Sequence, residues 1–216
     1  MEMTKTLTDK GNESAVINST TYTFSNGRPV SINYENIANP EYNSNKIFQY
    51  DENDRVIAEL EGGETVQSVA WDGEVATLIN SDGNAYGEAE LEDGNVIRYT
   101  TLGEGESIST FYSHDADGNV IAVESPEGEL LREFLSFNIE KTHPTHLLKS
   151  IAPIRITSAP FFTHIYETMR VQPIEGDDFS TELTDYTFEY TFDENGRVKT
   201  IEDNLSAIYT TWYQYL

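Results

Sequence analysis

Two histidines are the residues whose type and spacing come nearest to metal chemistry in this sequence. The stretch "HPTH" places His143 and His146 three residues apart, and on a helix they would share one face. A protein metal site needs at least a third ligand, and no neighbouring residue supplies it. The spacing therefore favours a plain helix start, and we predict no metal and no cofactor.

An acidic turn is the second candidate. Asp115, Asp117 and Asn119 surround Gly118 in "DADGN", which is similar to a calcium loop. The glycine comes too early for an EF-hand, however, and the distal glutamate is missing. Ordinary turn chemistry, in which an aspartate side chain accepts hydrogen bonds from the backbone that follows it, explains the same residues.

Enzyme motifs are missing from the sequence. "GESIS", at 105–109, is not a nucleophile elbow because its serine is not followed by x-Gly. The chain has neither a phosphate loop nor a dinucleotide fingerprint. Paired carboxylates can hydrolyse glycosides, but 38 acidic residues make some pairs inevitable. We predict no catalytic residues, and the sequence favours a non-enzymatic role.

Exposed aromatic side chains are the remaining candidates for ligand binding. Rings on a curved sheet can stack on sugars or grip a peptide, and the weak candidates are Trp71, Trp212, Tyr213 and Tyr215. The alternative is that these rings fill a concave core or cap the sheet.

Charge limits the partners. The formal net charge is −25, from 38 acidic and 13 basic residues. Such a chain repels nucleic acid and anionic membrane surfaces, and its acidic surface keeps a protein soluble. There is no cysteine, and no apolar run approaches the roughly 18 residues of a transmembrane helix.

Closely spaced turn signals define the elements that must position these residues. "SDGN" at 81–84, "EDGN" at 92–95 and "ADGN" at 116–119 belong to a series that runs from residue 50 to 130. Asn-Gly and Asp-Gly are strong hairpin signals because both residues tolerate positive φ. The pattern predicts an antiparallel meander of at least ten strands.

A nine-residue unit is written three times, as "FQYDENDRV" (48–56), "YSHDADGNV" (112–120) and "YTFDENGRV" (190–198). Each copy predicts a strand end, a tight turn and a strand start. The aspartate should bond the turn backbone, and Gly118 or Gly196 should supply positive φ, with Asp54 in that place in the first copy. An arginine follows the turn at Arg55 and Arg197, and also at Arg28 in the shortened copy "YTFSNGRPV" (22–30). We expect each to form a cross-strand ion pair.

Strict alternation marks the clearest strand, "DYTFEYTFD" at 185–193. Tyr186, Phe188, Tyr190 and Phe192 fall on one face and polar residues on the other. This period of two predicts one dry and one wet face.

The segment from Asn138 to Ala159 lacks hairpin signals. Within it, "HPTHLLKSIAP" predicts a short helix near 143–152, with Pro144 in the first turn and Pro153 at the end. Its basic residues form a patch that is unusual in this acidic chain, and we expect the segment to cross an end or opening of the sheet. These residues are Lys141, His143, His146, Lys149 and Arg155.

Two families share these patterns. The unit "YxYDxNGRV" resembles the YD-repeat hairpin of Rhs-type bacterial surface proteins. Scattered hairpins, a proline-rich helical break, "YTFEYTFDENGRVKTI" and an aromatic C-terminal strand resemble lipoproteins of unknown function from Bacteroides-type gut bacteria, which have a porin-like curved antiparallel sheet. That resemblance implies export and lipid anchoring at a cysteine outside this chain, and it brings no catalytic residues.

Taken together, the patterns predict an all-β fold. We expect a large curved antiparallel meander, open or partly closed like a barrel, in one domain over 1–216, with residues 1–18 as a disordered N-terminal arm. The resemblance to the lipoproteins implies a location in the bacterial cell envelope, outer-membrane-associated or periplasmic. The expected role there is non-enzymatic binding or scaffolding, with a protein or carbohydrate partner. The alternative is a carbohydrate-binding or carbohydrate-active protein that uses exposed aromatic residues.

Overall fold

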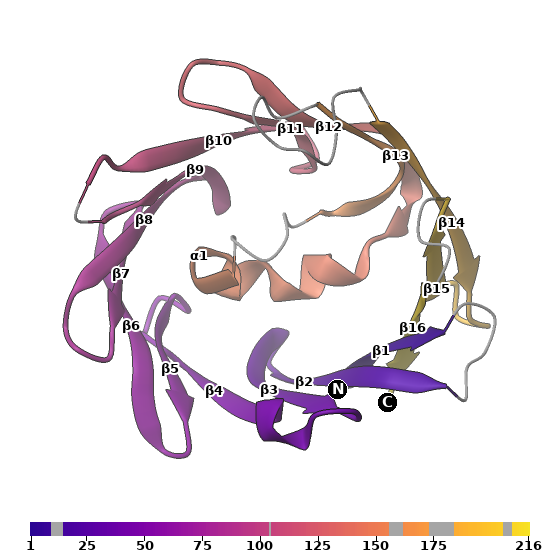
Figure 1. Cartoon of the computed structure of the whole chain (residues 1–216), viewed down its shortest axis with the longest axis horizontal. Coiled ribbons are helices and arrows are strands. Elements are labelled where there is room, and N and C mark those ends of the chain that lie inside the picture. Colours follow the sequence, from indigo (N-terminus) through magenta and orange to yellow (C-terminus); the bar gives the residue numbers. More distant parts are fainter. Residues whose placement is uncertain (10–14, 104, 156–161, 173–183, 205–208) are drawn as a thin grey trace. The chain divides into compact units, whose positions relative to one another are not determined.

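The computed structural model describes residues 1–9, 15–103, 105–155, 162–172, 184–204 and 209–216. Its sixteen strands follow one another in an antiparallel meander, and hydrogen bonds also join the first strand to the last, so that the strand order is that of a closed barrel (Figure 1). The all-β prediction is confirmed, and the sheet closes rather than staying open.

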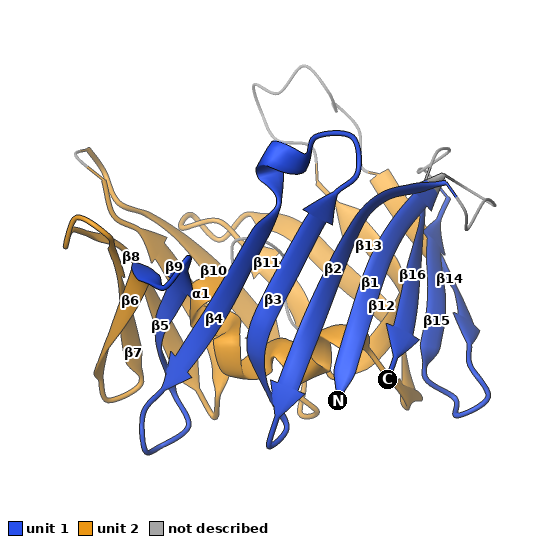
Figure 2. Ribbon diagram, turned by 90° about the horizontal axis from the view of Figure 1, so that it is seen from below, with its two compact units in different colours: residues 1–66, 188–216 blue, residues 67–187 orange. Residues whose placement is uncertain are grey.

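The chain forms two compact units, residues 1–66 with 188–216, and residues 67–187 (Figure 2). The strands of unit 1 are β1 (Glu2–Asp9), β2 (Val16–Ser25), β3 (Arg28–Asn36), β4 (Ser44–Tyr50), β5 (Val56–Glu61), β15 (Val198–Asp203) and β16 (Tyr209–Tyr215), with the short 3-10 helix η1 (Pro40–Tyr42) after β3. The strands of unit 2 are β7 (Val75–Asn80), β8 (Ala85–Glu92), β9 (Asn95–Thr101), β10 (Ile108–His114), β11 (Val120–Glu124), β12 (Leu130–Thr142) and β13 (His164–Val171). The unit boundaries fall inside β6 (Glu64–Asp72) and β14 (Thr184–Phe192).

The N-terminus is not the disordered arm that we expected. Residues 2–9 form β1, which pairs with β2 and with β16, and β2 begins at Val16. Residues 10–14 lie outside the described part. The arm prediction was wrong because a threonine-rich strand with few apolar residues carries a weak strand signal, while pairing on both sides satisfies its backbone.

The repeated unit forms the predicted hairpin. In each copy the aspartate Oδ1 accepts two backbone hydrogen bonds of 2.9–3.0 Å, at Asp51, Asp115 and Asp193. The positive-φ positions are Asp54 (62°), Gly118 (76°) and Gly196 (75°). Arg55 and Arg197 pair with the aspartate of their own turn, Nε to Oδ2, at 2.9 and 2.8 Å. The repeat is therefore a turn that carries its own hydrogen-bond partners.

The aromatic strand β14 alternates as predicted, but its rings are only partly buried. The polar residues that alternate with the rings from Asp185 to Thr191 are exposed, whereas Tyr186, Phe188, Tyr190 and Phe192 are half-buried and keep some accessible surface. The two faces alternate as predicted, but the face that carries the rings is not fully buried. Among the described residues the two most buried aromatic side chains, Phe162 and Phe134, lie in unit 2. Phe134 packs against Phe162 and Tyr166 with ring centroids 4.7 and 5.0 Å away.

A helical crossover lies on the concave side of the unit 2 sheet (Figure 1). It consists of the 3-10 helix η2 (Pro144–Ile151) and the short α1 (Ala152–Arg155), so the predicted helix near 143–152 is confirmed. Pro153 does not end it, because a proline fits the first turn of α1 as well as Pro144 fits that of η2. Within unit 2, α1 contacts β7 and β9.

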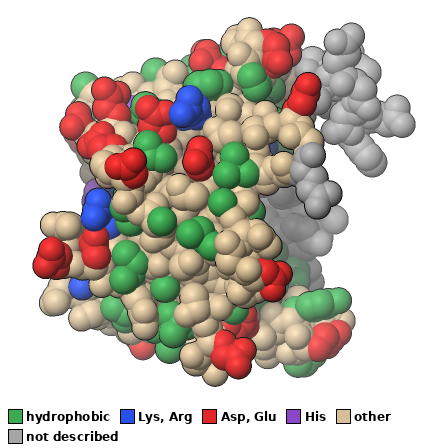
Figure 3. Space-filling model, turned by 90° about the vertical axis from the view of Figure 1, so that its left-hand side faces the viewer, with side chains coloured by type: hydrophobic (Ala, Val, Ile, Leu, Met, Phe, Trp, Pro, Cys, Tyr) green, Lys and Arg blue, Asp and Glu red, His purple; other side chains and the backbone are tan. Residues whose placement is uncertain are grey.

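The surface reflects the acidic composition. In the face drawn in Figure 3, acidic side chains are spread among polar and apolar ones, and basic side chains are sparse. Acidic charge on this face is thus distributed rather than gathered into one patch, as expected of a solvated surface.

Candidate functional site

The Asp115–Asn119 turn of unit 2 is the point at which the crossover meets the sheet. Asp115 Oδ1 accepts from the backbone N–H of Asp117 and Asn119, and Asp115 Oδ2 accepts from Asn119 Nδ2 at 2.8 Å. All three contacts lie within the turn, so both carboxylate oxygens are already used in shaping it.

Asn119 joins this turn to the start of β13. Its side chain is fully buried. Oδ1 accepts from the backbone N–H groups of Thr163 (3.1 Å) and His164 (2.7 Å), while Nδ2 also lies 3.2 Å from His164 Nδ1. Because Oδ1 accepts from two backbone N–H groups, the orientation of the amide is fixed. One side chain thereby links two segments that are 45 residues apart in the sequence.

Lys149 carries the crossover's contact with the same turn. Its Nζ donates to Gly118 O at 3.3 Å, to Asn95 Oδ1 at 3.2 Å and to Thr163 Oγ1 at 3.0 Å. All three partners are uncharged oxygens, from the start of β9, the turn and the residue before β13. The ammonium group thereby holds three parts of unit 2 to η2.

Burial sets the electrostatics of this junction. It lowers the pKa of Lys149 below its ordinary value, although the charge of Asp115 opposes the shift. Burial would raise the pKa of Asp115, but hydrogen bonds from the Asn119 side chain and from the backbone of Asn119 and Asp117 hold it below the ordinary value. Asp115 is thus an anion at neutral pH, which suits the turn and does not suit a general acid.

All four histidines of the chain lie in unit 2, on β10, η2, β13 and the residue before η2. Burial, followed by the charge of Lys149, lowers the pKa of His114 and of His146. His143 is buried, and its Nδ1 accepts from the backbone N–H of Thr145 at the start of η2. The "HPTH" motif is therefore a helix cap, and no group of three or more metal-ligating side chains occurs in the described ranges.

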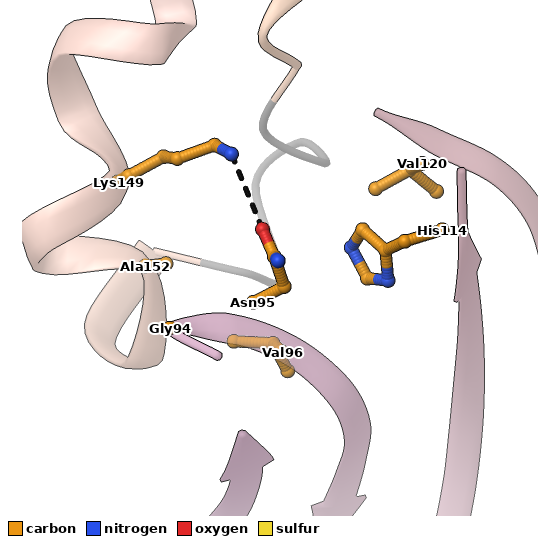
Figure 4. A pocket seen from close by; sticks show the side chains of 7 residues that line it. All are labelled: Gly94, Asn95, Val96, His114, Val120, Lys149 and Ala152. Atoms are coloured by element: carbon orange, nitrogen blue, oxygen red, sulfur yellow. Dashed lines mark hydrogen bonds between the residues drawn. The ribbon is translucent and has the colours of Figure 1, made fainter. Parts of the chain in front are cut away.

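A small cavity separates the crossover from the sheet (Figure 4). Its volume is about 10 Å³, which is room for one water molecule. The lining residues are Gly94, Asn95, Val96, His114, Val120, Lys149 and Ala152. A space of this size can hydrate Lys149 and His114 but cannot admit a larger ligand.

A much larger cleft opens beside this cavity. Its volume is about 850 Å³, and it is framed by the turns after β8, β10 and β11. Carboxylates line it at Glu92, Asp93, Asp115 and Glu124, and rings line it at Phe111, Tyr112 and His114. Three residues that line the cleft also lie at the Lys149 junction. Asn95 and His114 line the small cavity together with Lys149, and the carbonyl of Gly118 accepts a hydrogen bond from Lys149. The junction thus fixes one wall of the cleft.

The four aromatic residues predicted to bind a ligand do not come together around this cleft. Trp71 lies on β6 of unit 2, and the other three lie on β16 of unit 1. Trp212 Nε1 donates to Thr8 Oγ1 at 2.8 Å, and Arg197 Cζ lies 4.4 Å from the ring centroid of Tyr215. On β16, Trp212 and the two tyrosines alternate in sequence and so face opposite sides of the strand. Ligand binding by any of the four stays a prediction.

Sequence reasoning found the crossover and its basic residues but missed the partner that anchors them. One signal was present in the repeat. The residue after the turn glycine is Asn119 in the second copy, where the equivalent residues are Arg55 and Arg197. Those arginines turn back to their own aspartate, whereas the shorter asparagine is buried and reaches β13. A departure from a repeat can thus mark the copy that carries a tertiary contact.

Replacing Gly118 by alanine tests the fit of the junction. A Cβ there would lie 3.1 Å from Lys149 Nζ and 3.2 Å from Asn95 Oδ1, on a residue with φ of 76°. Gly128 is a matched control in unit 2, because its φ is 80° and nothing lies within 4 Å of its Cβ position. We expect G128A to cost about 1 kcal/mol from backbone strain, and G118A about 1 kcal/mol more. Equal losses in denaturant melts would contradict a tight junction.

Alkaline titration tests the burial of Tyr112. Burial raises its pKa to about 12. Since the folded value lies above that of the unfolded chain, the stabilisation is complete below pH 10 and is lost as the pH rises toward 12. Ultraviolet titration should show one fewer late-ionising tyrosine in Tyr112→Phe, and the variant should lose less stability than the wild type between pH 9 and 11.5. A Tyr112 that ionises near pH 10 would overturn the assignment.

Comparison with known proteins gives structural neighbours and no family. No family model matches the chain, and no curated protein matches it. No helix among the described residues is long and apolar enough to span a membrane. The chain is similar to a porin-like protein from Bacteroides uniformis ATCC 8492, with a TM-score of 0.44 and 12% identity over 99% of this chain and 96% of that one. It is also similar to a porin-like protein from Bacteroides vulgatus ATCC 8482, with a TM-score of 0.42 and 10% identity over 98% of this chain and 97% of that one.

Proposed function

We propose that the protein is a non-enzymatic binding protein whose ligand occupies the cleft of unit 2. The observation that carries the proposal is the cleft itself, with a volume of about 850 Å³ between three hairpin turns. That volume lies in the range of small-molecule sites. Its wall at Asn95 and Gly118 is held by Lys149, so the shape exists before a ligand arrives.

The lining favours a polyhydroxylated ligand, and we propose a carbohydrate. Sugar hydroxyls donate well to carboxylates, which here are Glu92, Asp93 and Glu124 in addition to the occupied Asp115. The apolar faces of sugar rings pack on aromatic side chains such as Phe111. Anionic ligands would be repelled by the same carboxylates.

Binding without turnover is the simpler assignment for this cleft. The oxygens of Asp115 accept hydrogen bonds from its own turn, which leaves it poorly placed to exchange protons with a substrate. The proposal therefore assigns recognition to the cleft and no bond cleavage.

We place the protein in the bacterial cell envelope as part of the same proposal, with a lipid anchor outside this chain. The support is the resemblance of its hairpins, helical break and aromatic C-terminal strand to exported lipoproteins, and of its repeats to YD hairpins. Cell fractionation of the source bacterium with an antibody to the chain should recover it with the envelope. Recovery with the cytosolic proteins would contradict the envelope location, and it would leave the proposal of ligand binding in the cleft unaffected.

A panel of oligosaccharides tests the binding proposal by calorimetry and thermal shift. We expect at least one neutral oligosaccharide to bind and to raise the melting temperature. Phe111→Ala and Glu124→Gln should weaken that binding by about tenfold or more. Trp71→Ala and Tyr215→Ala should leave the affinity unchanged.

The outcomes separate the two candidate sites. A loss of affinity confined to the Trp71 or Tyr215 variant would move the site to the exposed aromatic residues. Binding of cationic peptides in place of sugars would keep the cleft and replace the ligand class. Failure of every sugar and every peptide to bind would overturn the binding function.

A further inference from the structure

The hydrogen bonds of two histidines require a particular protonation state. His143 Nδ1 accepts from the backbone N–H of Thr145 at 3.2 Å and lies 2.7 Å from Thr145 Oγ1. A ring nitrogen that accepts a backbone N–H carries no proton. The cap of η2 therefore depends on a neutral His143, whose ring packs against those of Phe162 and Tyr166 with centroids 5.5 and 5.7 Å away.

His164 is constrained in the same way from the other side of the junction. The Asn119 amide is oriented by the two backbone donors on its Oδ1, so its Nδ2 must be the donor toward His164 Nδ1 at 3.2 Å. His164 Nδ1 is then an acceptor without a proton. A proton on His164 Nδ1 would face the N–H donor of the Asn119 side chain. In the same way, a proton on His143 Nδ1 would face the backbone N–H of Thr145.

The other two histidines border the same segment. Lys149 of η2 acts unfavourably on the protonated forms of both His114 on β10 and His146 on η2. The charge of His164 also acts on His146. On the opposing side stands one anion, Asp115, which favours the charged form of His114 and whose own pKa is lowered by the charge of His164. A hydrogen bond to the Tyr112 backbone also raises the pKa of His114. The oxygens of Asp115 are already bonded within its turn, and the β9 side chain that meets Lys149 is the uncharged Asn95.

We propose that these four histidines form a proton-sensitive latch that holds the crossover, residues 143–155, to the Asp115–Asn119 turn and to the start of β13. In the closed latch, Nδ1 of His143 and of His164 accepts a hydrogen bond and carries no proton. Acidification through the ordinary histidine range adds protons to the imidazoles of His114 and His146 beside Lys149. The crossover is then released from the sheet of unit 2. This release does not depend on which ligand the cleft binds.

The sign of the effect follows from the shifted groups. Burial and Lys149 lower the pKa of His114 and His146 in the docked state. As the pH falls through the ordinary histidine value, the released state takes up protons before the docked state does, so release becomes more favourable. Above that value neither state is charged, and the latch has no pH dependence from these two residues.

Hydrogen exchange at pH 7.5 and pH 5.0, corrected for the intrinsic rates, tests the latch on the intact chain. We expect residues 143–155 to lose about tenfold more protection on acidification than the β7–β8 hairpin, residues 75–92. The matched variant is H143N/H164N, because an asparagine Oδ1 can replace each Nδ1 as acceptor and asparagine also caps helices well. Its acid-induced loss should be clearly smaller than that of the wild type, and the loss that remains should disappear when His114 and His146 are also replaced by asparagine.

Either of two results would overturn the latch. One is a parallel loss of protection in the crossover and the β7–β8 hairpin, and the other is a variant that loses as much as the wild type. A second measurement does not require the variant to fold. Long-range proton–nitrogen spectra at pH 7.5 should show both His143 and His164 with the proton on Nε2, and a proton on Nδ1 of either would reject the proposal.

Discussion

Asn119→Ala should lower the free energy of unfolding by about 3–5 kcal/mol, as measured in denaturant melts at pH 7.5. The substitution removes the acceptor for the backbone N–H groups of Thr163 and His164 and the donor to Asp115 Oδ2. Because Asn119 is fully buried, water does not readily replace these partners. Each buried group left without a partner costs about 1–3 kcal/mol.

The repeat provides the matched control for Asn119. Arg197 occupies the equivalent position in the third copy and bonds Asp193 at the surface, at 2.8 Å. Arg197→Ala should cost less than about 1 kcal/mol, as exposed ion pairs usually do. A similar loss in both variants would mean that the position matters only for the turn and that the contact with β13 is not a main source of stability.

Phe134→Ala should be nearly as damaging, with an expected loss of about 3–5 kcal/mol. The ring is 3% exposed and forms the centre of a cluster with Val120, Val123 and Phe162. Its removal takes away the ring contacts and leaves a cavity that the surrounding sheet cannot fill. Edge-to-face packing with Phe162 and Tyr166 adds to the loss.

Phe188→Ala is the comparison for Phe134. Phe188 belongs to the alternating strand β14 but keeps part of its surface accessible. It should therefore cost clearly less than Phe134→Ala, about 1–2.5 kcal/mol, since less apolar area is buried. A larger loss for Phe188→Ala would show that the aromatic strand, and not the cluster around Phe134, is the dominant apolar core.

The strands and turns could be predicted because their signals are local. Asp51, Asp115 and Asp193 each fold a turn with partners two and four residues away, and a pattern of nine residues contains all of them. The alternation of β14 is visible in nine consecutive letters. Even the crossover carried a local signal, in Pro144 and the loss of hairpin residues around it.

The closure of the sheet and the junction could not be predicted in the same way. β1 pairs with β16 across more than 200 residues, and its threonine-rich sequence shows neither a dry face nor a partner. Asn119 and His164 are 45 residues apart, and their contact depends on where the crossover returns the chain. The cleft is framed by three turns that the fold of the meander brings together, whereas aromatic content alone pointed to Trp71 and β16.

Mapping of amide chemical shifts by nuclear magnetic resonance, during titration with the oligosaccharide that binds most tightly, tests the central claim most directly. If the cleft of unit 2 is the binding site, the largest changes will fall within residues 92–97, 111–118 and 124–128, the three segments that contain its lining residues. Changes centred on Trp71 or on β16, or shifts spread evenly over the strands, would contradict the assignment of the ligand to this cleft.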